Sequence, residues 1–154
     1  GKLIEGVYEG ETLNTPSMFC VADALDSLMW IKEIGGLTET IRRSNENFKC
    51  LQSWVDKTPW IENLVSDPRN RSNTSVCLKF SDERFISLIP DEKTRFVKEF
   101  VGLLEVENAA FDIKGHRNAP PGLRIWCGAT INLDDIQKLL PWLEYCFHEI
   151  ISSY

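Results

Sequence analysis

The sequence has no long apolar run, and this absence is the first constraint on its class. A helix that crosses a bilayer needs about 18 or more consecutive apolar residues, and no run in the 154 residues approaches that length. The first residues, Gly1-Lys2-Leu3-Ile4-Glu5, also lack the layout of a secretory signal peptide. We therefore expect no membrane partner and a cytoplasmic location.

Positive charge is in short supply. The chain has 17 Lys and Arg against 23 Asp and Glu, which gives a formal net charge of −6. An acidic chain has no long-range attraction for nucleic acid or for anionic lipid. We expect no nucleic-acid partner, and an anionic ligand would have to be held by a local group of cations.

Closely spaced cysteine pairs are absent too. The five cysteines lie far apart among apolar neighbours, and none is part of a CxxC pair: Cys20, Cys50, Cys77, Cys127 and Cys146. Structural zinc normally shows close-spaced ligand pairs, and an odd number of cysteines does not favour a disulfide framework. We interpret them as reduced core thiols and expect no metal site. The sequence also contains no P-loop, no GxGxxG and no nucleophile elbow.

Helical periodicity is what the sequence does contain. Apolar side chains at helical spacing predict helices over 18–34, 38–55 and around 96–104, and a last one from about Leu133. Gly35-Gly36 provides a stop for the first helix, and Asn132 is a good N-cap for the last.

Four short segments favour strands: 60–65, 75–80, 109–113 and 123–129. A turn at 67–70 makes the first two of them candidates for a hairpin. The residues before Pro16 alternate around glycines and predict an extended arm. This order of elements predicts an α+β fold, in which a small, largely antiparallel sheet carries helices on one face.

The loop 115–122 is the sharpest candidate for a functional site. His116 and Arg117 lie in a Gly/Pro-rich stretch that leads into a strand, and Arg124 follows near the start of that strand. The planar guanidinium group of arginine suits carboxylates and phosphates. A small ligand with two or three negative charges would fit this cluster, although solvated loop residues could show the same pattern.

A second candidate lies just before the first predicted helix. Asn14 and Thr15 offer short hydrogen-bonding side chains where a helix N-terminus favours an anion. Ordinary helix capping explains the same residues.

Three longer motifs resemble one enzyme family. They are Gly10-Glu11-Thr12-Leu13-Asn14-Thr15-Pro16-Ser17-Met18, Arg71-Ser72-Asn73-Thr74-Ser75-Val76-Cys77-Leu78 and Ala119-Pro120-Pro121-Gly122-Leu123-Arg124-Ile125-Trp126-Cys127-Gly128. In this order they resemble the C-terminal region of phosphoserine aminotransferases, which are fold-type I, class V enzymes that use pyridoxal 5'-phosphate (PLP). These enzymes are more than twice as long as the present chain.

The resemblance implies two parts and a set of residue roles. Residues 1–35 would be the arm and connecting helix at the end of the large, PLP-binding domain, and residues 36–154 the small C-terminal domain. Asn14 and Thr15 would reach the phosphate of PLP. Arg124 would clamp the α-carboxylate of the substrate, and His116 with Arg117 would bind the substrate phosphate. No residue of the chain is assigned as catalytic, because the Schiff-base lysine of the family lies upstream of the Asn-Thr-Pro motif.

The resemblance also implies an activity and its partners. The full-length enzyme would be a homodimer that exchanges an amino group between phosphoserine and 2-oxoglutarate, with 3-phosphohydroxypyruvate and glutamate as the other partners, in serine biosynthesis. The fragment alone would be inactive. The alternatives are a non-catalytic domain that binds a phosphorylated amino acid or mediates oligomerisation, and another class V transaminase such as an alanine–glyoxylate type.

Overall fold

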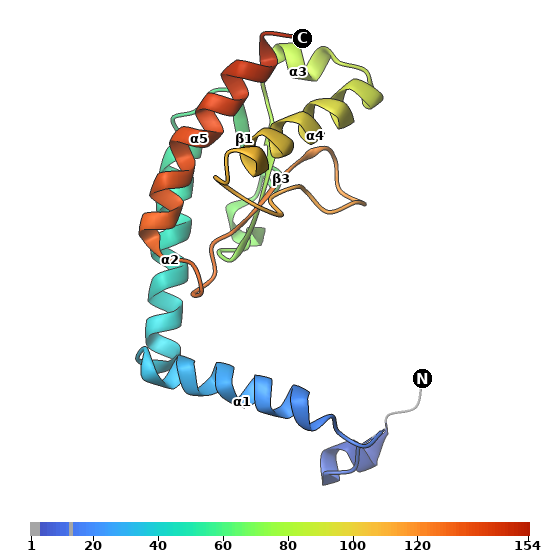
Figure 1. The fold of residues 1–154 in the computed structure, drawn as a ribbon, viewed down its shortest axis with the longest axis vertical. Coiled ribbons are helices and arrows are strands. Elements are labelled where there is room, and N and C mark those ends of the chain that lie inside the picture. The colour runs from blue at the N-terminus through green and yellow to red at the C-terminus, as the bar shows by residue number, and fades with distance from the viewer. Residues whose placement is uncertain (1–3, 13) are drawn as a thin grey trace. The chain divides into compact units, whose positions relative to one another are not determined.

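A computed structural model describes residues 4–12 and 14–154. The chain divides into two compact units, Gly1–Glu39 and Thr40–Tyr154, which we call unit 1 and unit 2. Figure 1 shows the elements in chain order. They are η1 Glu5–Glu9, α1 Met18–Glu33, α2 Gly36–Val55, β1 Ile61–Asn63, η2 Pro68–Asn70, β2 Ser75–Phe80, α3 Glu83–Ser87, α4 Pro90–Val106, β3 Gly122–Trp126 and α5 Leu133–Ile151.

Unit 1 consists of a short 3-10 helix followed by α1. The 3-10 helix η1 replaces part of the extended arm that the sequence predicts, and Gly10 ends it in the left-handed region with φ 93°, which glycine adopts at little cost. The predicted helix over 18–34 is confirmed as α1. It begins after Ser17, whose Oγ accepts a hydrogen bond from the Cys20 N–H at 3.4 Å, and the left-handed Gly35 follows its end.

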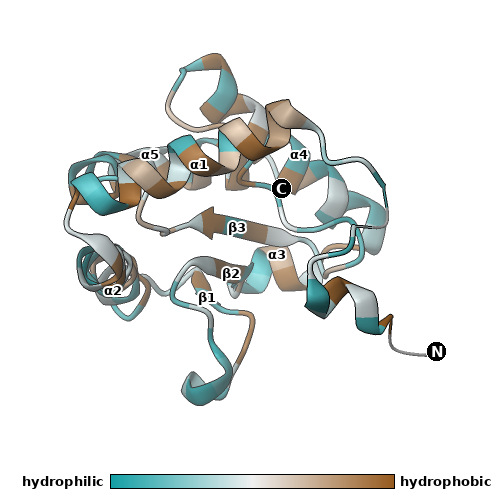
Figure 2. Cartoon of the chain, turned by 90° about the horizontal axis from the view of Figure 1, so that it is seen from below, coloured by the Kyte–Doolittle hydropathy of each residue, from teal (hydrophilic) through white to brown (hydrophobic). Residues whose placement is uncertain are grey.

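Unit 2 is built around a three-stranded antiparallel sheet in the order β1-β2-β3. Val76, Leu78 and Phe80 of β2 are buried, whereas the residues between them are half-buried. This alternation places helices over one face of the sheet, and Figure 2 shows α4 and α5 over β3. The predicted α+β class with a small antiparallel sheet is confirmed.

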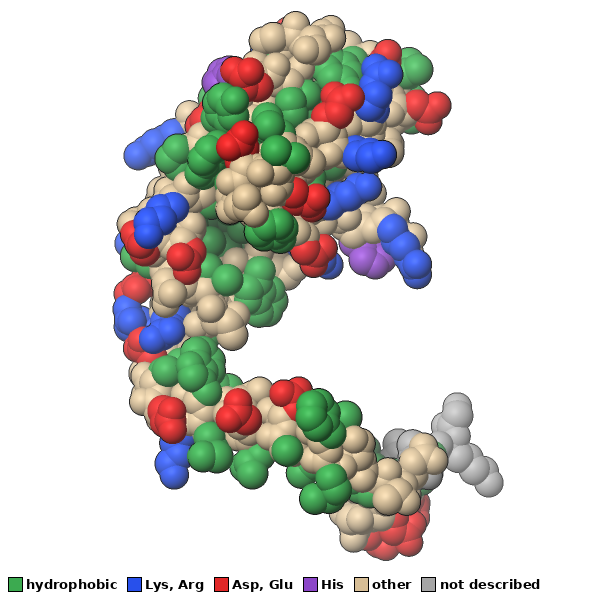
Figure 3. Space-filling model, viewed as in Figure 1, with side chains coloured by type: hydrophobic (Ala, Val, Ile, Leu, Met, Phe, Trp, Pro, Cys, Tyr) green, Lys and Arg blue, Asp and Glu red, His purple; other side chains and the backbone are tan. Residues whose placement is uncertain are grey.

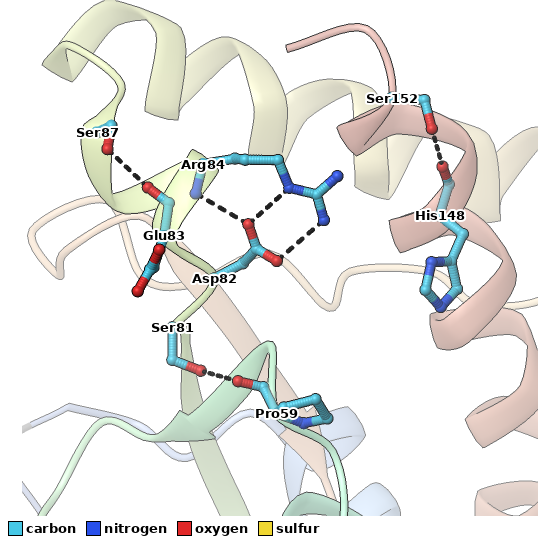
Figure 4. Close-up of polar contacts among 8 residues, drawn as sticks. All are labelled: Pro59, Ser81, Asp82, Glu83, Arg84, Ser87, His148 and Ser152. Carbon is cyan, nitrogen blue, oxygen red and sulfur yellow. Dashed lines mark hydrogen bonds and ion pairs between the residues drawn. The ribbon is translucent and has the colours of Figure 1, made fainter.

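Two local predictions about unit 2 are wrong. The segment 109–113 is irregular, and its neighbour Lys114 forms only an isolated bridge with Leu123. Asn108 and Asp112 both have φ 54°, which a regular strand cannot contain. The helix α3 was not predicted. It begins at Asp82, whose carboxylate accepts a hydrogen bond from the Arg84 N–H at 2.9 Å (Figure 4).

The core of unit 2 is an aromatic cluster between the sheet and the helices. The rings of Trp60 and Phe147 are stacked with their centroids 4.1 Å apart, and Phe80, Phe96 and Phe100 pack around them. Because these side chains come from β2, α4, α5 and the residue just before β1, the cluster joins the sheet to two of the helices.

A carboxylate beside this cluster ties three segments together. Glu144 of α5 accepts hydrogen bonds from the indole N–H groups of Trp54 and Trp60, both at 2.9 Å, and from the Thr58 hydroxyl at 3.3 Å. The donors lie at the end of α2 and just before β1. Buried indole N–H groups need acceptors, so Glu144 fixes the end of α2 and the entry to β1 against α5.

The start of α5 follows the capping signal in the sequence. The Asn132 N–H donates to the Asp135 carboxylate at 3.1 Å at the start of α5, which confirms the predicted start of that helix. None of the helices within residues 4–12 and 14–154 is long and apolar enough to cross a membrane.

The cysteines are free thiols and differ in their surroundings. Cys127 and Cys146 are buried, Cys50 and Cys77 are half-buried, and Cys20 on α1 is exposed. The prediction of core thiols is therefore correct for Cys127 and Cys146, correct in part for Cys50, which packs against the core, and wrong for Cys20. Cys77 is half-buried outside the core cluster. Among the described residues no group of His, Cys, Asp and Glu could hold a metal ion.

Candidate anion-binding site

The loop before β3 is closed at its base by backbone hydrogen bonds. The Gly115 N–H donates to the Gly122 carbonyl at 2.9 Å, and the Arg124 N–H donates to the Ile113 carbonyl at 2.7 Å. A Cβ atom on Gly122 would lie 2.2 Å from the carbonyl oxygen of Leu78, so only glycine fits where the loop joins the sheet. The residues between these bonds are thus held as one projecting loop.

This loop and α4 enclose a pocket of about 210 Å³. Three cationic or titratable side chains line it, Lys114, His116 and Arg117, and all three residues are exposed. The other lining residues are neutral: Thr94, Val97, Gly115, Ala119, Pro120, Pro121 and Gly122. We call this hollow the loop pocket.

No Asp or Glu of the described residues lines the loop pocket or pairs with its lysine and arginine. Its lining contains no Asp or Glu, and no described residue forms a salt bridge with Lys114 or Arg117. His116 accepts a hydrogen bond at Nδ1 from the Asn118 N–H at 3.2 Å, so a neutral imidazole carries its proton on Nε2 and can donate it. In a chain with net charge −6, this is a local cationic surface suited to an anion.

Arg124 lines a different hollow. It is half-buried on β3, opposite Cys77 of β2, and its pocket has a volume of about 400 Å³. The lining is Ser75, Phe111, Asp112, Ile113, Arg124 and Trp126. We call this hollow the Arg124 pocket. It shares no lining residue with the loop pocket.

The residues that form one cluster in the sequence are therefore divided between two pockets. His116 and Arg117 come together with Lys114 in the loop pocket, and Arg124 stands apart. The neighbours of Arg124 include two large exposed aromatic side chains, Phe111 at 64% and Trp126 at 51% exposure. The Asp112 carboxylate also lies 3.7 Å from the Arg124 guanidinium group. A single arginine suits a carboxylate, whereas two cations and a histidine suit a group with a higher charge.

Asn14 and Thr15 belong to unit 1 and are described within that unit alone. Both are exposed and lie just before α1, whose N-cap is Ser17. The first turn of a helix offers free N–H groups and the positive end of the dipole, and amide and hydroxyl side chains add further hydrogen bonds. The donor set fits a phosphate group.

Two residues of the site were not singled out from the sequence. Lys114 could have been found from the run Lys114-Gly115-His116-Arg117, which places two cationic side chains and a histidine in four residues. Asp112 could not, because its proximity to Arg124 depends on the irregular path of 109–113.

The buried cysteines contribute no nucleophile to this region. Burial raises the pKa of Cys127 to about 12 and that of Cys146 to about 11. Both thiols stay protonated near neutral pH, and the thiolate is the reactive form. The fold and the two pockets define the described part of the chain as a small α+β domain with two hollows that are lined in part by arginine side chains.

Sequence comparison finds that the chain is similar to part of a longer enzyme. No protein-family profile matches the chain. The chain is 42% identical over 147 residues to the phosphoserine aminotransferase of Methanosarcina mazei and 42% identical over 148 residues to that of Methanosarcina barkeri. Each match covers 96% of this chain and 37% of the relative. The chain thus spans little more than a third of the length of these relatives and matches the C-terminal portion of phosphoserine aminotransferases.

Solved structures show the same fold. The phosphoserine aminotransferase from Bacillus circulans subsp. alkalophilus superimposes with a TM-score of 0.74 at 22% identity, over 93% of this chain and 36% of that one. A PLP-bound phosphoserine aminotransferase from Trichomonas vaginalis gives a TM-score of 0.70 at 23% identity, over 90% and 36% of the two chains. The fold implied by the sequence motifs is confirmed.

Proposed function

We propose that this chain is the C-terminal part of a phosphoserine aminotransferase and that it binds and orients the substrate. The longer protein would transfer an amino group between O-phospho-L-serine and 2-oxoglutarate, with 3-phosphohydroxypyruvate and glutamate as the products. The observation that carries the proposal is the separation of two hollows in unit 2, one lined by Lys114, His116 and Arg117 and one that contains Arg124 beside Asp112. The substrate has two anionic ends of the matching kinds.

Arg124 binds the α-carboxylate in this proposal. Its guanidinium group can donate two parallel hydrogen bonds to a carboxylate and stays charged at every relevant pH. The backbone of Arg124 is held by the sheet pairing with Cys77 and by the hydrogen bond to Ile113. A ligand carboxylate would therefore be oriented from a rigid strand, and both amino-acid and 2-oxo-acid substrates would depend on this residue.

The loop pocket binds the phosphate. Lys114, His116 and Arg117 supply charge and donors, and the volume of about 210 Å³ suits a small group. A site built for a charged group rejects an analogue that lacks it, because the cations are then left without a partner. The loop pocket would in this way select phosphoserine over serine.

The cofactor would be PLP, held mainly by the remainder of the longer protein. Asn14 and Thr15, at the start of α1, fit a role at the phosphate of PLP. When bound, PLP supplies the electron sink on which the amino group is carried. The residues of this chain bind and orient, and the lysine that reacts lies in the part of the relatives that the chain does not cover. The chain alone is then inactive.

Two further features belong to the proposal. In a homodimer, Asn14 and Thr15 of one subunit would reach the cofactor of its partner, as the family resemblance implies. A cytoplasmic location suits an enzyme of serine biosynthesis.

The proposal is tested with kinetic measurements on a longer protein that contains this chain. Arg117→Ala should lower kcat/KM for phosphoserine at least tenfold, while turnover of an unphosphorylated amino acid changes little, since only the phosphate contact is lost. The control is Arg69→Ala, because Arg69 is exposed, pairs with Asp67 and lines neither pocket. An equal loss with both substrates would refute the phosphate role, and absence of transaminase activity in the parent protein would refute the proposed function.

A further inference from the structure

Arg124 already has an anionic neighbour in the structure. The carboxylate Oδ2 of Asp112 lies 3.7 Å from Nη2 of Arg124, and both residues line the Arg124 pocket. The side chain of Asp112 is 91% exposed and that of Arg124 is 37% exposed. The separation is longer than that of a close hydrogen-bonded pair, so the carboxylate neutralises part of the charge without filling the fork of the guanidinium group.

The backbone brings Asp112 to this position in an uncommon conformation. Its φ of 54° lies in the left-handed region, which Asp and Asn tolerate better than other residues with a side chain. The segment departs from strand geometry here and returns to the sheet at Ile113, whose carbonyl accepts the hydrogen bond from Arg124. The position of the carboxylate thus follows from the same loop that holds the arginine backbone.

Two aromatic side chains flank this ion pair. Phe111 and Trp126 also line the Arg124 pocket, and the Trp126 indole is held by a hydrogen bond from Nε1 to the Thr130 hydroxyl at 3.0 Å. A ligand carboxylate that enters this pocket meets the negative charge of Asp112 at the same time as the positive charge of Arg124.

We propose that Asp112 is the resident counter-ion of Arg124 and competes with the substrate carboxylate for it. This inference rests on the proposed function. Asp112 holds the guanidinium group when no substrate is bound. The substrate carboxylate must displace Asp112 before it can accept two parallel hydrogen bonds from Arg124. Because Asp112 is almost fully exposed, it can turn into solvent when it is displaced. Asp112 therefore sets the affinity for carboxylates below the value that Arg124 alone would give.

The test compares Asp112→Asn with a matched control in a longer protein that contains this chain. Asparagine keeps the size of the side chain and tolerates the left-handed backbone, so the substitution removes the charge alone. We expect KM for glutamate to fall about two- to fivefold, which is the usual strength of an exposed ion pair, with kcat little changed. The control, Asp91→Asn, makes the same chemical change in the first turn of α4, outside the Arg124 pocket, and should leave KM unchanged.

A second measurement on the 154-residue chain does not depend on a substrate. Exchange of the Arg124 side-chain N–H protons with water, observed by NMR, should become faster in Asp112→Asn and in Asp112→Gly, and should be unaffected in Asp91→Asn. An unchanged exchange rate in both Asp112 variants would overturn the inference, because the pair would then not exist in solution.

The outcomes separate this inference from the proposed function. If Arg124→Ala raises KM for glutamate more than tenfold but Asp112→Asn leaves it unchanged, the inference fails and the proposed function stands. A rise of KM in Asp112→Asn would show that Asp112 positions Arg124 for the substrate, which contradicts competition. If Arg124→Ala itself has no effect, the carboxylate role fails and the inference fails with it.

Discussion

Unit 1 and unit 2 differ in how they use their apolar side chains. All 23 buried hydrophobic residues of the described chain lie in unit 2, between Leu51 and Ile151. The helix α1 of unit 1 buries none of its residues, although it carries several large apolar side chains that are at least half exposed: Met18, Phe19, Val21, Leu25, Leu28 and Met29. Figure 3 shows hydrophobic side chains gathered along this helix.

The two units therefore differ in what stabilises them. A helix that is apolar on several sides is normally buried, and α1 has no core of its own. Unit 2 has an aromatic core that joins helices and sheet, so it can fold by itself. This fits the proposal that unit 1 belongs to the large domain of a longer protein and that unit 2 is the small domain.

The largest expected effect contrasts one phenylalanine from each unit. Phe147 is 1% exposed and stacks on Trp60, whereas Phe19 of α1 is 83% exposed. Phe147→Ala should lower the free energy of unfolding by about 3–5 kcal/mol, because it leaves a cavity in the core. Phe19→Ala should change it by less than about 0.5 kcal/mol. Urea denaturation of the chain measures both values, and comparable losses would break the contrast between the units.

The next effect concerns the carboxylate that joins α2, β1 and α5. Glu144→Gln replaces one of two acceptor oxygens by a donor group, so one indole N–H of Trp54 or Trp60 loses its acceptor. We expect a loss of about 1–3 kcal/mol in the free energy of unfolding. Glu149→Gln is the matched control, because Glu149 is exposed on the same helix. If the two variants are equally stable, the hydrogen bonds to Glu144 do not hold unit 2 together.

Thiol reactivity sharpens the comparison in a different way. Cys20 of α1 is exposed and should react quickly with a thiol reagent at pH 8, and Cys20→Ser should remove this fast phase. Cys127 and Cys146 are buried, and burial raises their pKa values to about 12 and about 11, so they should react only after unfolding. Mass spectrometry of the labelled chain assigns each site, and rapid labelling of Cys127 would contradict the described core.

The same two thiols give the stability of unit 2 a pH dependence. Their pKa is higher in the folded chain than the ordinary value of 9.0, so between pH 9 and about pH 12 the folded state retains protons that the unfolded state has lost. Stability should therefore be constant below pH 9 on this account and decline as the pH rises through that range. Thermal unfolding at pH 8 and pH 10.5, compared with a Cys127→Ala variant, measures the contribution, and a greater stability at pH 10.5 would contradict it.

The smallest expected effect is the removal of unit 1. A chain of residues 40–154 should keep the cooperative unfolding of the parent, with a Tm within about 4 °C, because the core lies wholly in unit 2. Calorimetry of the two chains tests this. Loss of the unfolding transition would show that α1 and the start of α2 contribute to the folded core.

The sequence predicts the elements whose pattern is local. The strand at 75–80 is predicted by its run of residues that favour strands, and the helix from Leu133 by apolar residues that recur at helical spacing through Ile151. The segment 109–113 also contains several apolar residues, but Asp112 within it has a positive φ that composition does not reveal. With only five residues, α3 is too short to show a period.

The sequence predicts which residues form the candidate site, but it does not predict how they are arranged. His116, Arg117 and Arg124 are close in sequence, and the sequence alone makes them one cluster. Their division into two pockets depends on the pairing of β3 with β2 and on the hydrogen bonds that close the loop, which are contacts between distant or irregular segments. The same contacts bring Asp112 to Arg124. No local sequence pattern predicts these contacts.

The most direct test of the central proposal is a crystal structure of a longer protein containing this chain, with O-phospho-L-serine bound. We predict the phosphate within hydrogen-bonding distance of Lys114, His116 and Arg117, and the α-carboxylate on the guanidinium group of Arg124. A phosphate on Arg124, or a ligand outside both pockets, would contradict the assignment of one anionic end to each pocket.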